Sequence, residues 1–150
     1  MAHYGIYGVW RQGGRVVAIR KARGPYRGML DLPGGAPENE ESPTESLRRE
    51  LLEECGVNQV DILSWHTFDF FVEKSSTGQL VNLYHRGLIA VVRVLDEVVN
   101  IENVEDVRGV ELIDPDEHDV AELTPPLRYA LTLLDAAPPL IHHSERKPTV

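Results

Sequence analysis

Residues 42–56 constrain the fold most, because both ends of one helix are marked in the sequence. Ser42 is a residue type that caps helices, Pro43 suits the first helical position, and Glu45 completes a capping box with the serine. Gly56 is the residue type that most often ends a helix, because it adopts the left-handed conformation without steric cost. The sequence therefore predicts a helix that runs from Pro43 to just before Gly56.

Two stripes run along this predicted helix, one acidic and one apolar. Residues three or four apart share a helix face, so glutamates and apolar residues fall on neighbouring stripes. The acidic stripe contains Glu50, Glu53 and Glu54, and the apolar stripe contains Leu47, Leu51 and Cys55. Glu50 and Glu54 are like charges one turn apart, which repel each other unless something neutralises them.

A divalent cation with oxygen ligands is the natural partner for such an acidic stripe. Mg²⁺ binds one or two carboxylates, keeps several waters and bridges to substrate phosphates, which fits the pattern better than a fully caged Ca²⁺. The alternative is an ordinary solvated helix face, in which Glu45 pairs with Arg48 and Arg49.

The segment before the helix is rich in glycine and proline. It has too many of both for a regular element, so we expect a long loop broken by a short strand at Met29–Leu32. Gly34 and Gly35 allow the backbone to approach a ligand closely, and the Gly34 carbonyl is a candidate metal ligand. Glu41 is placed to pair with Arg49 and fasten the loop to the helix, or else forms an ordinary surface ion pair.

The rest of the chain alternates strand-like runs with turns and ends in a further helix. Apolar and β-branched runs predict a hairpin of two strands, two long strands that pair antiparallel, and a later strand. The predicted strands are Tyr4–Trp10, Arg15–Ala22, Val60–Val72, Leu80–Leu95 and Val107–Ile113, and the second helix runs from Pro125 to about Ala136. This order predicts an α/β (α+β) fold, an α/β/α sandwich with a mixed β-sheet between helices. We expect one domain over residues 1–137 and a loose tail over residues 138–150.

The glycine loop and the helix together form one motif with fixed spacing. Five residues separate Gly35 from Glu41, and seven separate Glu41 from the run Arg49-Glu50-Leu51-Leu52-Glu53-Glu54-Cys55-Gly56-Val57. This pattern matches the Nudix box, G-x5-E-x7-R-E-U-x-E-E-x-G-U with U aliphatic, at every defined position. Such agreement arises by chance far more rarely than a lone glycine-rich loop. The preceding Leu32-Pro33-Gly34 also resembles the family.

The resemblance implies a role for each charged residue of the box. It implies that Glu50, Glu53 and Glu54 are the catalytic residues and bind Mg²⁺, for which Mn²⁺ can substitute. It makes Glu50 the candidate general base, and it makes Glu41 and Arg49 a structural pair.

In many members of the family, a further acid from a distant loop joins the metal or acts as the base. The candidates in this chain are Glu102 and Glu105, in an acidic loop over residues 96–106. The chemistry that the resemblance implies is hydrolysis of a diphosphate linkage. Metal ions withdraw charge from phosphorus and lower the pKa of a bound water, while a carboxylate accepts the proton of that water.

The formal net charge of −9 argues against binding to nucleic-acid polymers or to anionic membranes. Arg20, Lys21, Arg23 and Arg27 nevertheless form a basic cluster just before the box, and they are candidates for holding substrate phosphates. The alternative is a set of solvated strand-end charges.

No apolar run is long enough to span a membrane, and no secretory signal is recognised, so we expect a cytoplasmic protein. The single cysteine, Cys55, excludes internal disulfides and a cysteine-built zinc site.

The box does not identify the group attached to the diphosphate. ADP-ribose hydrolases of the family typically have a proline some way past the box, whereas this chain has none between Val57 and Asp114. This absence favours a nucleoside triphosphate or a related nucleotide as substrate.

Aromatic residues on predicted strands are candidates for stacking on a base, with core packing as the alternative. The strand histidines His66 and His85 are expected to be structural. The aromatic residues are Tyr4, Tyr7, Trp65, Phe68, Phe70 and Tyr84.

Two classes of function are compatible with a Nudix fold. The first is hydrolysis of a small nucleotide, and the second is a sensor that binds a nucleotide without turnover. Sensors of this kind usually have an eroded box, so the complete box favours the hydrolase. The resemblance also makes a homodimer plausible.

Overall fold

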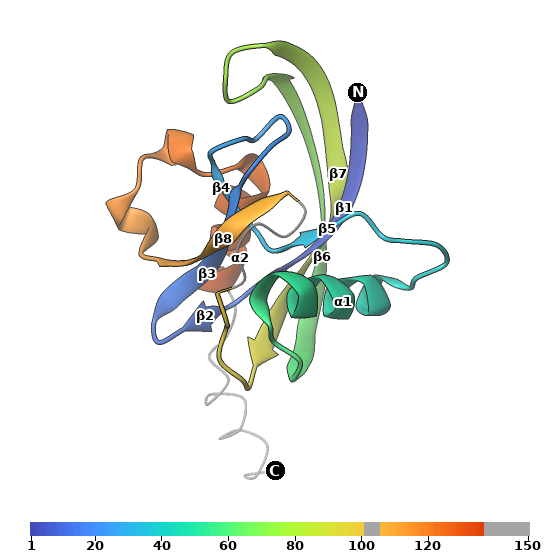
Figure 1. Ribbon diagram of the computed structural model, residues 1–150, viewed down its shortest axis with the longest axis vertical. Helices are drawn as coiled ribbons and strands as arrows, with labels where there is room; N and C mark the ends of the chain where they lie inside the picture. The colour runs from blue at the N-terminus through green and yellow to red at the C-terminus, as the bar shows by residue number, and fades with distance from the viewer. Residues whose placement is uncertain (101–105, 137–150) are drawn as a thin grey trace.

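The structure, a computed structural model, describes residues 1–100 and 106–136. It contains two sheets and two α-helices (Figure 1). The strands are β1 (Ala2–Val9), β2 (Arg11–Gln12), β3 (Arg15–Lys21), β4 (Leu30–Asp31), β5 (Gly34–Gly35), β6 (Val60–Lys74), β7 (Leu80–Val94) and β8 (Val107–Ile113). The helices are α1 (Pro43–Cys55) and α2 (Pro125–Ala136), with two 3-10 turns at Pro115–Glu117 and Val120–Glu122. None of the described helices is long and apolar enough to cross a membrane.

The first sheet is mixed and has the strand order β5-β1-β7-β6. Its two long strands, β6 and β7, pair antiparallel as the sequence predicts. β1 runs parallel to β7 on the other side, with Ile6 opposite Leu88. The glycines of β5 pair with β1, so that Gly34 lies opposite Tyr7. The loop before α1 is thereby fastened to the edge of this sheet, next to β1.

The second sheet is antiparallel, and its pairing shows that the predicted hairpin was wrong in its first strand. β3 pairs with β2, β4 and β8, so the hairpin turns at Gly13 and Gly14 but includes only the short β2. The predicted strand Tyr4–Trp10, observed as β1, belongs to the first sheet instead. The chain crosses between the sheets at Trp10, which is buried. The parallel partner of β1 lies far away in the sequence, so local alternation of residues did not reveal it.

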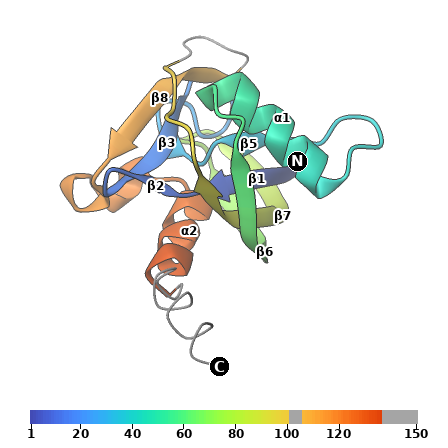
Figure 2. The same cartoon turned by 90° about the horizontal axis from the view of Figure 1, so that it is seen from below.

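Both faces of the two sheets are covered by helices. Successive residues of a strand point to opposite faces, so Val17 of β3 packs in the cluster under α1, and Ala18 packs in the cluster under α2. Figure 2 shows α1 and α2 on opposite sides of the strands. This arrangement confirms the predicted α/β/α sandwich. Cys55 is fully buried in the cluster under α1.

The ends of α1 lie where the sequence predicts them. The Ser42 hydroxyl accepts a hydrogen bond from the Glu45 amide at 3.1 Å, and the Glu45 carboxylate accepts one from the Ser42 amide at 2.8 Å. Gly56 adopts the left-handed conformation with φ of 68° and ends the helix. The second predicted helix is confirmed as α2, and the short strand expected near residue 30 is observed as β4.

Candidate active site

Helix α1 places the three glutamates of the box at the border between core and solvent. Glu50 and Glu54 are each only 4% exposed, whereas the side chain of Glu53 is 33% exposed. The apolar stripe beside them, with Leu47 and Leu51, is fully buried and fixes the rotation of the helix. The helix therefore holds two carboxylates under the surface and one at its edge.

Arg49 connects these glutamates to the loop that precedes the helix. Its guanidinium forms a two-point ion pair with Glu41, with N–O distances of 2.6 and 3.0 Å. One nitrogen, Nη1, also donates to Glu50 at 2.8 Å and to Glu53 at 2.9 Å. The other, Nη2, donates to the carbonyl of Ala36 at 3.3 Å. A planar guanidinium with several donors suits such a junction, and a lysine ammonium does not.

The two glycines of β5 bring the backbone into contact with the acidic stripe. The Gly34 amide donates a hydrogen bond of 2.9 Å to the Glu54 carboxylate. Gly34 has φ of 143°, and a Cβ atom there would collide with the Ile6 carbonyl and would lie 2.7 Å from the Cα of Tyr7. Position 34 therefore admits only glycine without a shift of β1.

The carboxyl groups of this site differ in how their surroundings shift their pKa values. Burial raises the pKa of Glu54 well above its ordinary value, and the neighbouring Glu50 raises it further. The Gly34 amide and Lys21 act in the opposite direction. Arg49 lowers the pKa of Glu41 and keeps that carboxylate ionised. A further cation beside Glu50 and Glu54 would stabilise the ionised form of Glu54.

The Gly35→Ala variant tests how closely the loop and the helix must fit. A Cβ atom at position 35 would lie 3.0 Å from Glu50 Oε2, so this carboxylate would have to move by a few tenths of an ångström. We expect a decrease in kcat of about tenfold with a change in stability below about 1 kcal/mol, because the atom in contact is the end of a side chain. Steady-state kinetics and thermal unfolding would measure both. An unchanged kcat would contradict a precise placement of Glu50.

A cavity of about 310 Å³ is connected to the box through one residue. Tyr7, the residue opposite Gly34, lines this cavity, and so does Lys21. The Gly34 amide in turn binds Glu54, so Tyr7 connects the cavity to the buried carboxylates. Burial raises the pKa of Tyr7, and the charges of Asp31, Glu54 and Glu50 add to this rise. We refer to it below as the inner cavity.

The basic cluster predicted from the sequence is divided by the fold. Lys21 and Arg23 line the inner cavity, where both pair with Asp106 at 3.5 and 3.3 Å. Arg20 instead binds Glu111 through two bonds of 2.8 and 2.9 Å on the second sheet. Arg27 lies at a different cavity. The structure therefore brings only Lys21 and Arg23, of these four candidates, together at one cavity.

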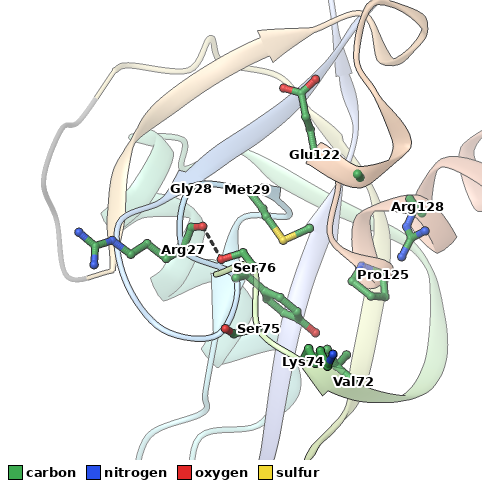
Figure 3. A pocket seen from close by; sticks show the side chains of 12 residues that line it. Arg27, Gly28, Met29, Val72, Lys74, Ser75, Ser76, Glu122, Pro125 and Arg128 are labelled. Atoms are coloured by element: carbon green, nitrogen blue, oxygen red, sulfur yellow. Dashed lines mark hydrogen bonds between the residues drawn. The ribbon is translucent and has the colours of Figure 1, made fainter. Parts of the chain in front are cut away.

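That other cavity, of about 470 Å³, lies between the turn at Arg27, the tip of the β6–β7 hairpin and the start of α2 (Figure 3). The hairpin tip is fastened there, because the Ser76 hydroxyl donates a 2.6 Å bond to the Arg27 carbonyl. The Arg27 side chain points away from the cavity in Figure 3. Neither this cavity nor the inner cavity is lined by a residue of the box, but the inner cavity includes Tyr7, which lies opposite Gly34.

Comparisons with known proteins agree with this geometry. A model of the NUDIX domain matches residues 1–134. The chain belongs to the Nudix family. A MutT-like protein of Streptomyces ambofaciens is 34% identical over 132 residues, which cover 85% of this chain and 71% of the relative.

Solved structures share the Nudix fold. A NUDIX hydrolase from Nitrosomonas europaea superposes with a TM-score of 0.71 at 18% identity, covering 91% of this chain and 90% of that one. The NUDIX domain of NrtR from Shewanella oneidensis, solved with ADP ribose, superposes with a TM-score of 0.61 at 14% identity, covering 91% of this chain and 86% of that one. The chain is a Nudix hydrolase, a class that acts on nucleoside diphosphate derivatives and generally uses divalent metal ions.

The glutamates of the Nudix box offer carboxylate oxygens, which are suitable ligands for a divalent metal ion. Within residues 1–100 and 106–136, no three acidic, histidine or cysteine side chains meet as a complete ligand set, and Arg49 draws Glu50 and Glu53 toward itself. Mg²⁺ commonly takes few protein ligands and completes its shell with water and substrate phosphates. A buried, like-charged pair of carboxylates fits that requirement. The candidate acids Glu102 and Glu105 lie outside the described residues.

The polar residues inside the inner cavity were not predicted from the sequence. Asp31 is buried in β4 and accepts a 2.6 Å bond from the Thr124 hydroxyl, and its burial raises its pKa. His85 accepts or donates bonds of 2.9 Å to Tyr7 and 2.8 Å to Tyr26. An acidic residue between Leu30 and Leu32 in an apolar strand was the available signal. The aromatic candidate Tyr7 lines the cavity, whereas Tyr4, Trp65, Phe68, Phe70 and Tyr84 do not.

Proposed function

We propose that this Nudix hydrolase cleaves the diphosphate linkage of a nucleoside triphosphate or a related nucleotide and requires Mg²⁺, for which Mn²⁺ can substitute. The observation that carries the proposal is the acidic stripe of Glu50, Glu53 and Glu54 on α1, in which Glu54 binds the Gly34 amide. Gly34 lies opposite Tyr7, which lines the inner cavity together with Lys21 and Arg23. Carboxylates next to cations can hold a metal ion and phosphates side by side.

The glutamates of α1 hold the metal ion in this proposal, together with the carbonyl of Gly34. When bound, the ion neutralises phosphate charge and lowers the pKa of a water molecule. Glu50, the first glutamate of the Arg49-Glu50-Leu51-Leu52-Glu53-Glu54 run, is the candidate base that accepts the proton from the attacking water. Glu41 and Arg49 position the loop and do not touch the reacting atoms.

Lys21 and Arg23 orient the outer phosphates. Both cations are ion-paired with the single carboxylate of Asp106, so each retains donors for an anionic ligand. Their positive charge also offsets the repulsion between a polyphosphate and a chain of net charge −9. The leaving group is itself a phosphate, so positioning and charge stabilisation account for most of the catalysis.

A substrate panel tests the proposal. Purified protein is incubated with nucleoside triphosphates, dinucleoside polyphosphates, nucleotide sugars and ADP-ribose, with and without Mg²⁺, next to the Glu53→Gln variant. We expect Mg²⁺-dependent turnover of nucleoside triphosphates that collapses in the variant. Turnover of another class alone would correct the substrate, and turnover that persists in the variant would refute the role of the box.

A sensor that binds without turnover is the second candidate, because the NrtR domain of similar fold was solved with ADP ribose. Mg²⁺-dependent nucleotide binding together with no hydrolysis of any panel member would favour the sensor. The complete box favours the hydrolase.

Several further expectations belong to the same proposal. We propose that residues 1–137 form the catalytic domain and that residues 138–150 are a tail outside it. We also propose that the enzyme works in the cytoplasm on small nucleotides, without nucleic-acid polymers or membranes as partners, and that it can form a homodimer. Size-exclusion chromatography with light scattering would test the last point.

A further inference from the structure

Asp31 is a buried carboxyl group that the hydrolysis described above does not use. It is 2% exposed, lies in β4 and lines the inner cavity. Its Oδ1 atom accepts two hydrogen bonds, at 2.8 Å from the Leu32 amide and at 2.6 Å from the Thr124 hydroxyl. These two donors use the accepting capacity of Oδ1 and fix the plane of the carboxyl group.

The second oxygen of Asp31 is available to a ligand. Within the described residues, no hydrogen bond or ion pair reaches Oδ2, and the side chain lines the cavity. Burial raises the pKa of Asp31, whereas Lys21 and the bonds from Thr124 and Leu32 oppose that rise. N–H donors from a ligand would stabilise the ionised form further. Because Asp31 lines the cavity, a water molecule or a donor of a ligand can reach this oxygen there.

Ring side chains form part of the wall of the cavity. His3, Tyr26 and His85 line it, and the rings of His3 and His85 contact each other, with centroids 5.1 Å apart and planes tilted by 52°. Such ring surfaces can pack against a heterocyclic ring. Burial lowers the pKa of His85 to about 3, so its ring is neutral, and both of its nitrogens are bonded to tyrosine hydroxyls. The His85 ring is therefore fixed in place and has no nitrogen left for a ligand. Asp31 is then the residue that can accept hydrogen bonds from the edge of a bound ring.

We propose that Asp31 selects nucleotides whose base presents two adjacent N–H donors, which is the guanine edge. This inference rests on the proposed function and adds to it that the base of the substrate enters the inner cavity beside Asp31, with Lys21 and Arg23 of the same cavity left to bind phosphates. Thr124, at the start of α2, is the positioning residue that holds Asp31 in place.

The preference follows from the donor and acceptor patterns of the bases. A carboxylate only accepts hydrogen bonds, and guanine offers N1–H and the 2-amino group side by side. Adenine and cytosine each have an acceptor next to their amino group, and uracil has carbonyls on both sides of N3–H, so each would set an acceptor against Oδ2. A site that must bond a substrate N–H rejects analogues without it strongly, because its buried polar group is then unpaired.

The test compares GTP, ITP and ATP, since ITP differs from GTP only by the missing 2-amino group. For the wild-type protein with Mg²⁺, we expect kcat/KM for GTP to exceed that for ITP about tenfold and that for ATP about 100-fold. In Asp31→Asn the amide nitrogen would face the donors of guanine, so the GTP to ITP ratio should fall to about one. Thr124→Val should lower the same ratio without abolishing turnover. Asp61→Asn, at an exposed pair with Arg93, is the matched control and should change nothing.

Binding measurements keep the inference separate from catalysis. Calorimetric titration of the wild-type protein with GDP and IDP gives the same comparison without turnover, and thermal unfolding checks that the variants are folded. If no nucleotide is hydrolysed but GDP binds about tenfold more tightly than IDP, the proposed function fails and the role of Asp31 stands. Equal affinity for GDP and IDP, or an Asp31→Asn variant with the wild-type ratio, would overturn the inference.

Discussion

The Glu54→Gln variant is expected to lose about 1000-fold in kcat while its fold remains intact. Glutamine keeps the shape of the side chain, and its carbonyl oxygen can still accept the 2.9 Å bond from the Gly34 amide. Only the charge that would hold the metal ion is removed. Steady-state kinetics with Mg²⁺ and a circular dichroism spectrum would measure the two properties. A kcat within a few fold of the wild type would exclude Glu54 from the metal site.

The same variant should be more stable than the wild type when metal is chelated. Burial and Glu50 raise the folded-state pKa of Glu54, so the folded protein carries an energetic cost once the pH exceeds the unfolded value of about 4.5. That cost is absent below this pH and grows as the pH rises toward the folded value. We expect a Tm advantage of about 4 °C or more for Glu54→Gln at pH 8 and little difference at pH 4.5. Glu73→Gln, an exposed glutamate on β6, should show neither effect.

The Arg49→Met variant is expected to lose about 2–3 kcal/mol of stability and about 100-fold in kcat/KM. Methionine retains much of the apolar stem but leaves Glu41, Glu50 and Glu53 without their shared cation. Repulsion should then separate the loop from α1, since Glu41 is the loop side of the ion pair. Chemical denaturation and kinetics would measure the losses.

Two variants sharpen this experiment. Arg49→Lys keeps the charge but loses the planar two-point geometry, so its stability should lie between those of the wild type and Arg49→Met. Arg48→Met changes the adjacent, exposed arginine, which forms no ion pair among the described residues, and should be nearly neutral. Similar losses in the Arg48 and Arg49 variants would contradict the assigned role of Arg49.

The sequence was most informative where the determinants of structure are local. The cap at Ser42, the stop at Gly56 and the spacing of the glutamates all lie within one helix and its entry, and the structure has that helix at Pro43–Cys55. The antiparallel pair β6 and β7 was also predictable, because a short turn joins two long strands.

Pairings between distant segments were not predictable in the same way. Residues 4–10 and 15–22 look like the two arms of a hairpin, yet β1 pairs in parallel with β7, and only β2 pairs with β3 in the hairpin. Nothing in a local alternation of residues distinguishes these partners.

The inner cavity illustrates the same limit for function. Asp31 and Thr124 are far apart in the chain and meet only because α2 packs beside β4. His85 looked like an ordinary structural histidine on a strand, and its environment of two tyrosines appears only in the fold. The fold divides the basic cluster for a related reason. Arg20 and Lys21 are neighbours on a strand and therefore point to opposite faces of the sheet.

The burial of Cys55 makes the protein convenient for spectroscopic labelling. Burial raises the pKa of its thiol, and the side chain is inaccessible to solvent, so alkylating reagents should leave it unmodified in the folded state. The sequence contains no other cysteine. A cysteine introduced at the exposed Thr77, on the tip of the β6–β7 hairpin, would then be the single reactive thiol. A fluorophore or spin label attached there could report on nucleotide binding without prior removal of the native cysteine.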